Sequence, residues 1–258
     1  MKVVILAGGY GTRLGTITES IPKPMVPIGN YPIIWHIMKI YSHHGFNNFV
    51  LSLGYKAEVI KDYFYNQKML NNDFTIDLDN QDIQFHPRKD NHLNWKVTLV
   101  DTGINTLKGA RIKRIENYLD DVNLLTYGDG VADINLKELV KYHKKHGKTI
   151  TITGVRPPSR FGEIKIDNGR LVSFQEKPQT SSGLINGGFM VFNKNLLDYL
   201  KSDENCDLEY GAFNQLAEEG EMMVYTCENQ WECVDTERDL KHLNQLWDTN
   251  MAFWKVWS

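Results

Sequence analysis

A glycine-rich segment directly after the first apolar run is the part of the sequence best suited to chemistry. It reads Leu6-Ala-Gly-Gly-Tyr-Gly-Thr-Arg-Leu14. Glycines let backbone N–H groups approach a phosphate without a Cβ in the way, and the planar guanidinium of Arg13 suits phosphate oxygens. The segment is not a Walker loop, because no Gly-Lys-Ser/Thr follows it, and it is not a dinucleotide fingerprint, because Leu14 stands at the third glycine position. Taken alone, it is either a phosphate cradle or a tight turn.

A lysine between two prolines adds a second cation. It lies in Pro22-Lys-Pro-Met25, about ten residues after the glycines. Proline fixes the local backbone, so Lys23 is held in place rather than moving freely in solvent. Two positioned cations, Arg13 and Lys23, beside a glycine loop favour an anionic phosphate ligand over a simple turn.

Two aspartates follow predicted strands in the second half of the chain. Asp129 lies in Tyr127-Gly-Asp-Gly130, just past a predicted buried strand, and Asp235 follows a short strand at 231–234. Ligands of open α/β sheets bind outside the carboxyl ends of the strands. Each aspartate is either a turn former or a metal ligand. If the two converge, they predict Mg²⁺, which takes one or two carboxylates together with phosphate oxygens.

Further polar clusters lie beside short strands. Glu176-Lys-Pro178 and Asn186-Gly-Gly188 contain side chains able to hydrogen-bond sugar hydroxyls, and a turn is the alternative in each case. His143 and His146 lie three residues apart on a lysine-rich predicted helix. We interpret them as part of a solvated face rather than as a metal site.

The surrounding elements alternate between strand and helix. Residues 2–7 and 48–53 are predicted strands, and residues 31–41 and 56–65 are predicted helices. Such βαβα order implies a parallel sheet with helices on both faces. We therefore predict the α/β class: one Rossmann-like domain over residues 1–258, with a mostly parallel sheet flanked by helices. The aromatic tail at 247–258 is predicted to pack on the body or on a sister subunit.

Composition narrows the possible partners. The chain has 258 residues, is 41% hydrophobic and carries a net charge of −3. That charge argues against a protein that coats nucleic acid, which is usually strongly basic. No stretch approaches the ~18 consecutive apolar residues of a membrane span. Three cysteines without a Cys-x-x-Cys pair argue against a disulfide framework and against a zinc site. We expect a cytoplasmic protein.

Taken together and in this order, the glycine loop, Pro22–Met25, Gly128-Asp129, Glu176–Pro178, Asn186–Gly188 and Asp235 resemble the sugar-1-phosphate nucleotidylyltransferases. The resemblance covers nearly the whole chain. Residues 97–103 and 126–133 are most similar to the subgroup that joins CTP to glucose 1-phosphate, releasing pyrophosphate and making CDP-glucose for deoxysugar synthesis. Glu232-Cys233 departs from that subgroup, where Gln-Pro is expected.

The resemblance implies a role for each matching residue. Arg13, Lys23, Asp129 and Asp235 would be catalytic, and the two aspartates would bind Mg²⁺. Glu176, Lys177, Asn186, Gly187 and Gly188 would face the sugar phosphate. The nucleotide would be bound by Leu6, Ala7, Gly8, Gly9, Tyr10, Gly11, Thr12, Arg13, Lys23, Thr106, Arg111 and Gly128.

Alternatives to this reading remain open at the level of sequence. The base could be thymine or uracil rather than cytosine. The protein could be a relative that binds sugar nucleotides without catalysis, or a glycosyltransferase, although the glycine loop disfavours the latter. The resemblance also implies a homo-oligomer, specifically a hexamer.

Overall fold

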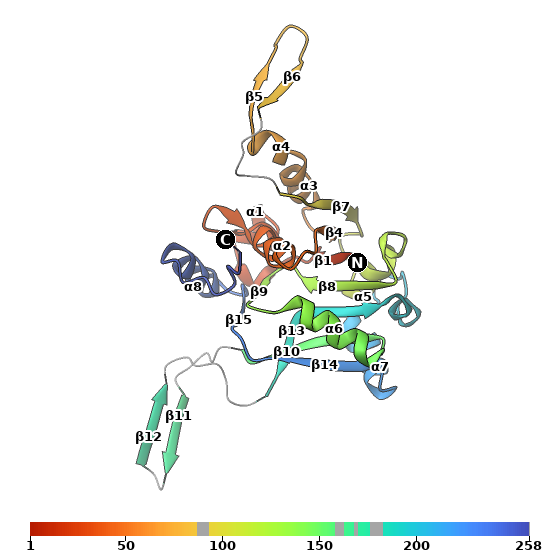
Figure 1. The fold of residues 1–258 in the computed structure, drawn as a ribbon, viewed down its shortest axis with the longest axis vertical. Helices are drawn as coiled ribbons and strands as arrows, with labels where there is room; N and C mark the ends of the chain where they lie inside the picture. The colour runs from red at the N-terminus through yellow and green to blue at the C-terminus, as the bar shows by residue number, and fades with distance from the viewer. Residues whose placement is uncertain (87–92, 158–162, 168–169, 176–182, 258) are drawn as a thin grey trace.

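A seven-stranded sheet forms the centre of the protein, seen in a computed structural model that describes residues 1–86, 93–157, 163–167, 170–175 and 183–257 (Figure 1). The strand order is β14-β10-β13-β8-β1-β4-β7. All neighbours pair in parallel except β13, which is antiparallel to both β10 and β8. The strands are β1 (Val3–Ala7), β4 (Asn48–Leu53), β7 (Lys96–Asp101), β8 (Val122–Tyr127), β10 (Ile150–Val155), β13 (Ile185–Asn193) and β14 (Met222–Cys227).

Strand β1 shows why the sheet is buried on both faces. All five of its residues are buried, and Val3 pairs with Phe49 of β4 on one side and Leu124 of β8 on the other. A continuous β-branched run of this kind is typical of a central parallel strand covered by helices on both sides. The predicted α/β class with a mostly parallel sheet is confirmed.

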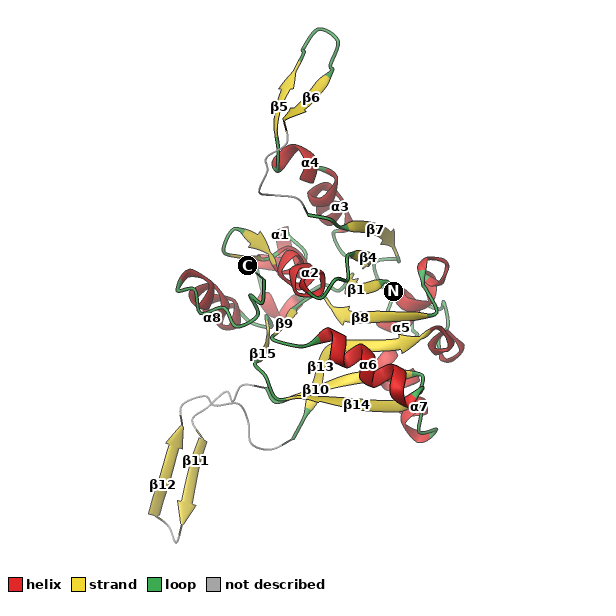
Figure 2. Cartoon of the chain, in the orientation of Figure 1, coloured by secondary structure: helices red, strands yellow, loops and turns green. Residues whose placement is uncertain are grey.

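Helices cover each face of the sheet, so that it lies between two apolar layers (Figure 2). Val3 and Ile5 point into a core shared with α2 (Ile33–His43), α3 (Ala57–Tyr65), α6 (Leu136–His146) and α8 (Glu237–Asp248). The intervening Val4 and Leu6 point into a second core. Its helical elements are α5 (Lys108–Arg114), η4 (Lys194–Tyr199), η5 (Leu208–Phe213) and α7 (Asn214–Glu218).

Short elements connect the larger ones. Between β1 and α2 the chain forms η1 (Thr12–Leu14), α1 (Ile17–Ser20), η2 (Lys23–Met25), β2 (Pro27–Ile28) and β3 (Tyr31–Pro32). Elsewhere it forms α4 (Gln67–Leu70), η3 (Glu116–Tyr118), β9 (Gly130–Ala132) and β15 (Trp231–Cys233). Within the described residues, none of the helices combines the length and apolar character that crossing a membrane requires.

The prediction of a solvated histidine face on α6 was wrong. His143 is only 1% exposed, and its ring nitrogens hydrogen-bond Oγ1 of Thr151 and Oδ1 of Asn193. His146 also hydrogen-bonds Oγ1 of Thr151. The lysines that surround the histidines in the sequence misled the interpretation, because the histidine side of α6 packs on β10 and β13.

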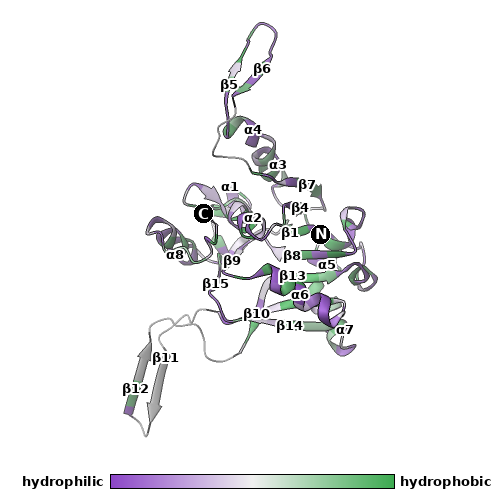
Figure 3. Ribbon diagram, viewed as in Figure 1, coloured by the Kyte–Doolittle hydropathy of each residue, from purple (hydrophilic) through white to green (hydrophobic). Residues whose placement is uncertain are grey.

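Two antiparallel hairpins extend away from the body (Figure 1). One pairs β5 (Asp73–Ile76) with β6 (Ile83–His86). The other pairs β11 (Glu163–Asp167) with β12 (Arg170–Gln175). The first hairpin carries green apolar segments far from either core (Figure 3).

Candidate active site

The largest concentration of predicted site residues lines a cavity of about 660 Å³. It lies where β1 and β8 end, which is the edge at which open α/β sheets bind ligands. The glycine loop, Lys23, Asp129 and Asp235 all line it. Its lining also includes Pro24, Ile104, Asn105, Thr106, Leu107, Lys108, Arg111, Tyr127, Gly128, Asn186, Glu209, Trp231 and Cys233.

A small antiparallel ladder brings the two aspartates together. Strand β9 follows Asp129, strand β15 precedes Asp235, and Cys233 pairs with Gly130. The N–H of Val234 donates to the backbone oxygen of Asp129 at 3.0 Å. Residues 106 positions apart in the chain are therefore fixed on one wall of the cavity, as the prediction of convergence required.

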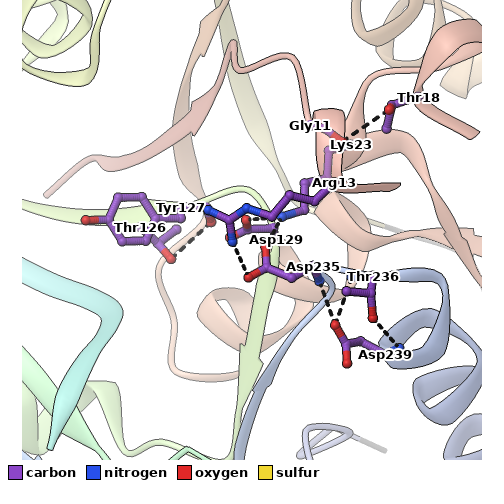
Figure 4. A network of polar contacts seen from close by, with 10 residues as sticks. All are labelled: Gly11, Arg13, Thr18, Lys23, Thr126, Tyr127, Asp129, Asp235, Thr236 and Asp239. Carbon is purple, nitrogen blue, oxygen red and sulfur yellow. Dashed lines mark hydrogen bonds and ion pairs between the residues drawn. The ribbon is translucent and has the colours of Figure 1, made fainter. Parts of the chain in front are cut away.

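Both predicted cations bind these carboxylates directly (Figure 4). Nζ of Lys23 lies 2.7 Å from Oδ2 of Asp129 and 2.8 Å from Oδ1 of Asp235. Nη1 of Arg13 lies 2.6 Å from Oδ2 of Asp235. The lysine side chain is largely buried, whereas that of Arg13 is 73% exposed. Lys23 therefore forms the fixed centre of the cluster, and Arg13 closes its solvent side.

The charges in this cluster stabilise one another. Burial lowers the pKa of Lys23, but the charges and hydrogen bonds of Asp129 and Asp235 outweigh it, and the net pKa is raised. Burial likewise raises the pKa of Asp235, and Lys23 and Arg13 reverse that effect, so that the net pKa is lowered. The ammonium and the Asp235 carboxylate therefore both stay charged near neutral pH.

The start of α8 fixes the backbone beside Asp235. Oδ2 of Asp239 accepts from the N–H groups of Asp235 and Thr236, and Oγ1 of Thr236 accepts from the N–H of Asp239 (Figure 4). This reciprocal arrangement is a capping box, which satisfies N–H groups that the first helical turn leaves free. It holds the Asp235 backbone at the mouth of the cavity.

The glycine loop needs glycine for two different reasons. Gly11 has a φ of +67°, and a Cβ there would lie 2.9 Å from Cβ of Lys23. Its carbonyl also accepts a hydrogen bond from Oγ1 of Thr18 at 3.2 Å (Figure 4). Gly8 has no such φ, but its Cβ would lie 2.2 Å from Nη1 of Arg111. The loop is therefore seated directly on two cationic side chains.

Arg111 lies beneath the loop. The residue is only 3% exposed, and its guanidinium hydrogen-bonds groups of the protein. Its Nη1 donates to the carbonyls of Leu53 and Gly103, and its Nη2 donates to the carbonyl of Gly8 at 3.0 Å. Arg111 also bonds Oγ1 of Thr102 and the carbonyl of Ile104. Arg111 therefore holds together the loops that follow β1, β4 and β7. Its positive charge lies beneath the glycine loop, where the nucleotide is predicted to bind.

Two other predicted nucleotide contacts also hold the walls together. Oγ1 of Thr106 accepts a hydrogen bond from Nη1 of Arg114 at 2.8 Å. A Cβ on Gly128 would lie 2.9 Å from Cγ of Pro24 and 3.1 Å from the carbonyl oxygen of Leu6. Glycine at 128 therefore lets the segment that carries Asp129 pass close to the lysine loop.

The Asn186-Gly-Gly188 motif lies against the cavity, but Asn186 alone of the three lines it. Its Oδ1 accepts from the N–H of Gly188, and its Nδ2 donates to the hydroxyl of Tyr127. Gly188 has a φ of +82°, and its Cβ would lie 2.7 Å from the Tyr127 ring. The carbonyl of Gly187 accepts from Nε1 of Trp231 at 2.7 Å. The other two predicted sugar-facing residues, Glu176 and Lys177, lie outside the described residues.

Sequence reasoning missed a second polar group that lines the cavity. Tyr127 was named only as part of the motif around Asp129, and Lys108 was not singled out. Glu209 had no local signal, because it lies in an unremarkable acidic stretch and meets Lys108 only through the fold. Cys233, noted in the sequence only as a departure from the subgroup, also lines the cavity, and burial raises the pKa of its thiol to about 12.

The donor set suits Mg²⁺ bound together with a phosphate ligand. Among the described residues no group of three or more histidines, cysteines or acids gathers as a metal site. Two carboxylates on one cavity wall are nevertheless what Mg²⁺ uses when substrate phosphates complete its shell. Asp129 and Asp235 therefore fit this ion, with Nζ of Lys23 within hydrogen-bond distance of both.

The fold and the cavity define an α/β protein with a charged cavity at the edge of a mostly parallel sheet. Residues 2–255 match the nucleotidyl transferase family, and the chain belongs to that family. It is 44% identical over 259 residues to the glucose-1-phosphate cytidylyltransferases of Salmonella typhi and Salmonella typhimurium (strain LT2), with 100% of both chains covered in each comparison. The crystal structure of HddC from Yersinia pseudotuberculosis is also similar, with a TM-score of 0.64 and 25% identity over 95% of this chain and 99% of that one.

Proposed function

We propose that this protein is a glucose-1-phosphate cytidylyltransferase, which condenses CTP with α-D-glucose 1-phosphate to give CDP-glucose and pyrophosphate. Full-length identity of 44% to two enzymes of that name supports the proposal. The observation that carries it is the convergence of Lys23, Arg13, Asp129 and Asp235 at one end of the cavity. We place the reaction in the cytoplasm, where CTP is made.

The substrate itself supplies the nucleophile. A phosphate monoester has a second pKa of ~6, so glucose 1-phosphate is already a dianion near neutral pH and needs no general base. One of its oxygens forms a bond to the α-phosphorus of CTP, and the bond from that phosphorus to the bridging oxygen breaks. Pyrophosphate leaves with the electron pair. The barrier is the repulsion between two polyanions, so catalysis depends on positioning and electrostatic stabilisation.

Each charged residue has a place in this scheme. Asp129 and Asp235 would hold Mg²⁺, which when bound supplies charge neutralisation and alignment of the phosphates. Lys23, released from the carboxylates, would contact the phosphates at the reacting centre. Arg13 lies at the exposed rim and would screen the leaving pyrophosphate. The backbone N–H groups of the glycine loop, seated on Arg111, would hold the remaining phosphate oxygens.

Base choice depends on a hydrogen-bond acceptor. Cytosine presents an N4 amino donor where uracil and thymine present an O4 acceptor. Leu6 and Ala7 line the cavity, and a backbone carbonyl of this segment would be suited to accept from that amino group. A site built in this way favours CTP over UTP and dTTP.

Pyrophosphate release with each nucleotide tests the proposal directly. Purified protein, Mg²⁺ and glucose 1-phosphate are combined with CTP, UTP or dTTP, and initial rates are compared. We expect turnover with CTP and a much lower kcat/KM for the other two. Preference for dTTP or UTP would indicate a thymidylyl- or uridylyltransferase, and the absence of turnover with all three would favour a non-catalytic binding protein. Transfer of glucose from CDP-glucose to an acceptor would instead indicate a glycosyltransferase.

We also propose that the protein is a homo-oligomer, with a hexamer as the specific expectation. The β5–β6 hairpin exposes the apolar side chains of Phe74, Ile76 and Ile83, none of which belongs to either core. An extended hairpin of this kind gains from packing against another subunit. Light scattering coupled to gel filtration gives the mass. A monomer at micromolar concentration contradicts this proposal without affecting the enzymatic one.

A further inference from the structure

The wall of the cavity formed by α5, β8 and η5 carries a second polar group, separate from the Lys23 cluster. Nζ of Lys108 forms an ion pair with Oε1 of Glu209, and the hydroxyl of Tyr127 donates to the same oxygen at 2.6 Å. Nδ2 of Asn186 donates to that hydroxyl at 3.2 Å. Lys108 also lies over the Tyr127 ring, 5.1 Å from its centroid. All four side chains line the cavity.

The packing of α5 against η5 brings Lys108 and Glu209 together. Glu209 lies on η5, a single π-helical turn, and such turns occur frequently at functional sites. The N–H of Ala110 donates to the carbonyl of Cys206, and a Cβ on Gly109 would lie 2.8 Å from that oxygen. Glycine at 109 therefore allows α5 to pack against the segment that leads into η5, which sets Lys108 opposite Glu209.

Each member of the group has a defined state. The hydroxyl of Tyr127 donates a hydrogen bond to Glu209 and accepts one from Asn186. Burial and the charge of Glu209 raise the pKa of this hydroxyl, so it remains a neutral donor. Both bonds to Glu209 involve Oε1. Among the described residues nothing donates to Oε2, and the side chain is 28% exposed. The wall therefore presents one spare carboxylate oxygen beside an ammonium.

This wall suits the uncharged part of the substrates. Lys108 and Glu209 sum to zero charge, and a carboxylate oxygen repels phosphate. At the other end of the cavity Arg13, Lys23 and Arg111 outnumber Asp129 and Asp235, so the net positive charge there attracts phosphate. A hydroxyl group can donate to the carboxylate and accept from the ammonium at once, and adjacent sugar hydroxyls fit such a donor–acceptor pair. Asn186, already expected to face the sugar, is hydrogen-bonded to this group through Tyr127.

We propose that Glu209 and Lys108 form the specificity wall for the hydroxyls of the hexose ring, with Tyr127 and Asn186 as positioning residues behind them. This inference rests on the proposed function and adds to it the residues that recognise the sugar. Glu209 accepts from one ring hydroxyl, and Lys108 donates to the same or the adjacent one. A hexose lacking that hydroxyl leaves the carboxylate without its partner, which disfavours the analogue.

The test compares Glu209→Gln with the parent enzyme at saturating Mg²⁺, using glucose 1-phosphate and its 2-, 3-, 4- and 6-deoxy analogues. Hydrogen bonds to charged groups are strong, so we expect the parent to lose roughly 10–100-fold in kcat/KM on one deoxy analogue. On glucose 1-phosphate, Glu209→Gln should have a kcat/KM lower than the parent's by a similar factor, because the KM for the sugar phosphate rises. The variant should then use glucose 1-phosphate and that deoxy analogue equally well. The KM for CTP should be unchanged.

Two control variants separate recognition from structure. Tyr199 donates to Glu219 at 2.7 Å on the surface, so Glu219→Gln neutralises a matched Tyr–Glu pair outside the cavity and should leave every rate unchanged. Tyr127→Phe keeps the carboxylate and the ammonium, and should keep discrimination against the deoxy analogue. If Tyr127→Phe reproduces the full effect of Glu209→Gln, Glu209 acts only by holding the tyrosine and the proposal fails.

Other outcomes also overturn the inference. If Glu209→Gln loses discrimination between CTP and dCTP instead, the wall binds the ribose rather than the hexose. If it keeps full discrimination among the deoxy sugars, Glu209 has no contact with the ring. Both outcomes require an active parent enzyme, whereas failure of the proposed function shows as an inactive parent, so the two failures are distinguishable.

Discussion

The ammonium of Lys23 lies 2.7 Å from a carboxylate oxygen of Asp129, although the two residues are 106 positions apart. The same ammonium reaches Asp235, so one cation joins the two acids expected to hold a metal. Under the proposed function, the carboxylates would take Mg²⁺ when metal and nucleotide bind, and Lys23 would exchange them for the phosphates.

Loss of Lys23 should therefore impair the chemical step. We expect Lys23→Ala and Asp129→Ala each to lower kcat by ~10²–10³, because removing one preorganised charge from a transition-state site costs ~2.7–4 kcal/mol. Steady-state pyrophosphate release measures the effect, and circular dichroism checks that the fold is intact. Turnover close to that of the parent in either variant would show that the assigned residue does not act on the reacting phosphates.

The stored ion pair also predicts how the free protein binds divalent cations. Lys23→Met leaves two carboxylates facing one another without their counter-charge. Opposite unit charges ~4 Å apart interact by ~4 kcal/mol at an effective dielectric constant of about 20, so metal binding should strengthen at least about tenfold when the competing ammonium is gone. Electron paramagnetic resonance of Mn²⁺ without nucleotide measures it.

The metal-binding experiment has matched controls. Lys141→Met removes an exposed lysine of α6 and should leave Mn²⁺ affinity unchanged. Asp235→Asn should weaken binding, because it removes one of the two carboxylates. Equal affinity in the parent and in Lys23→Met would mean that the lysine does not compete for the metal position.

Local patterns were enough to predict the sheet and the meeting of Lys23, Asp129 and Asp235 in the cavity. The apolar run of β1 and the glycines after it are contiguous, and Asp129 follows directly on a strand end, so each signal lies within a few residues. The Lys108–Glu209 pair joins positions 101 residues apart and has no local pattern. Burial of His143 depends on which side of α6 meets the sheet, which the surrounding lysines disguise.

Arg111 shows a different limit of sequence reasoning. Its type and position suggest either a solvated helix face or a nucleotide contact. In the fold its guanidinium is saturated by backbone carbonyls and one threonine hydroxyl, because three strands of the sheet end around it. A cation that stabilises loop backbone cannot be told from a ligand-binding cation until those loops are placed in space.

The seating of Gly8 on Arg111 can be tested with two neighbouring glycines. A Cβ at position 8 would lie 2.2 Å from the guanidinium, whereas one at position 9 would have nothing within 4 Å. Overpacking typically costs ~1–3 kcal/mol, so Gly8→Ala should lower Tm by about 2–10 °C. Gly9→Ala should leave Tm unchanged. Differential scanning fluorimetry measures both, and equal Tm values for the two variants would contradict the close seating.

His36 links the C-terminal tail to the core and predicts a pH dependence of stability. Its Nε2 hydrogen-bonds the carbonyl of Ile28 at 2.9 Å, and Nε1–H of the fully buried Trp254 donates to its Nδ1 at 3.3 Å. Nδ1 must therefore carry no proton. Burial lowers the pKa of His36 from 6.5 to about 4, because the charged ring would lose its water.

The sign of the effect follows from this lowered pKa. In the unfolded chain His36 takes up a proton below pH 6.5, whereas in the folded protein it does so only near pH 4. Its contribution to stability is therefore full above pH 6.5 and is lost progressively as the pH falls toward 4. Between pH 7 and pH 5 the loss should be about 2 kcal/mol.

Urea unfolding followed by tryptophan fluorescence at the two pH values measures this loss of stability. His36→Gln keeps a donor for Ile28 but cannot titrate, so its unfolding free energy should fall about 2 kcal/mol less over that range. The same pH dependence in both proteins would show that His36 is not the group responsible.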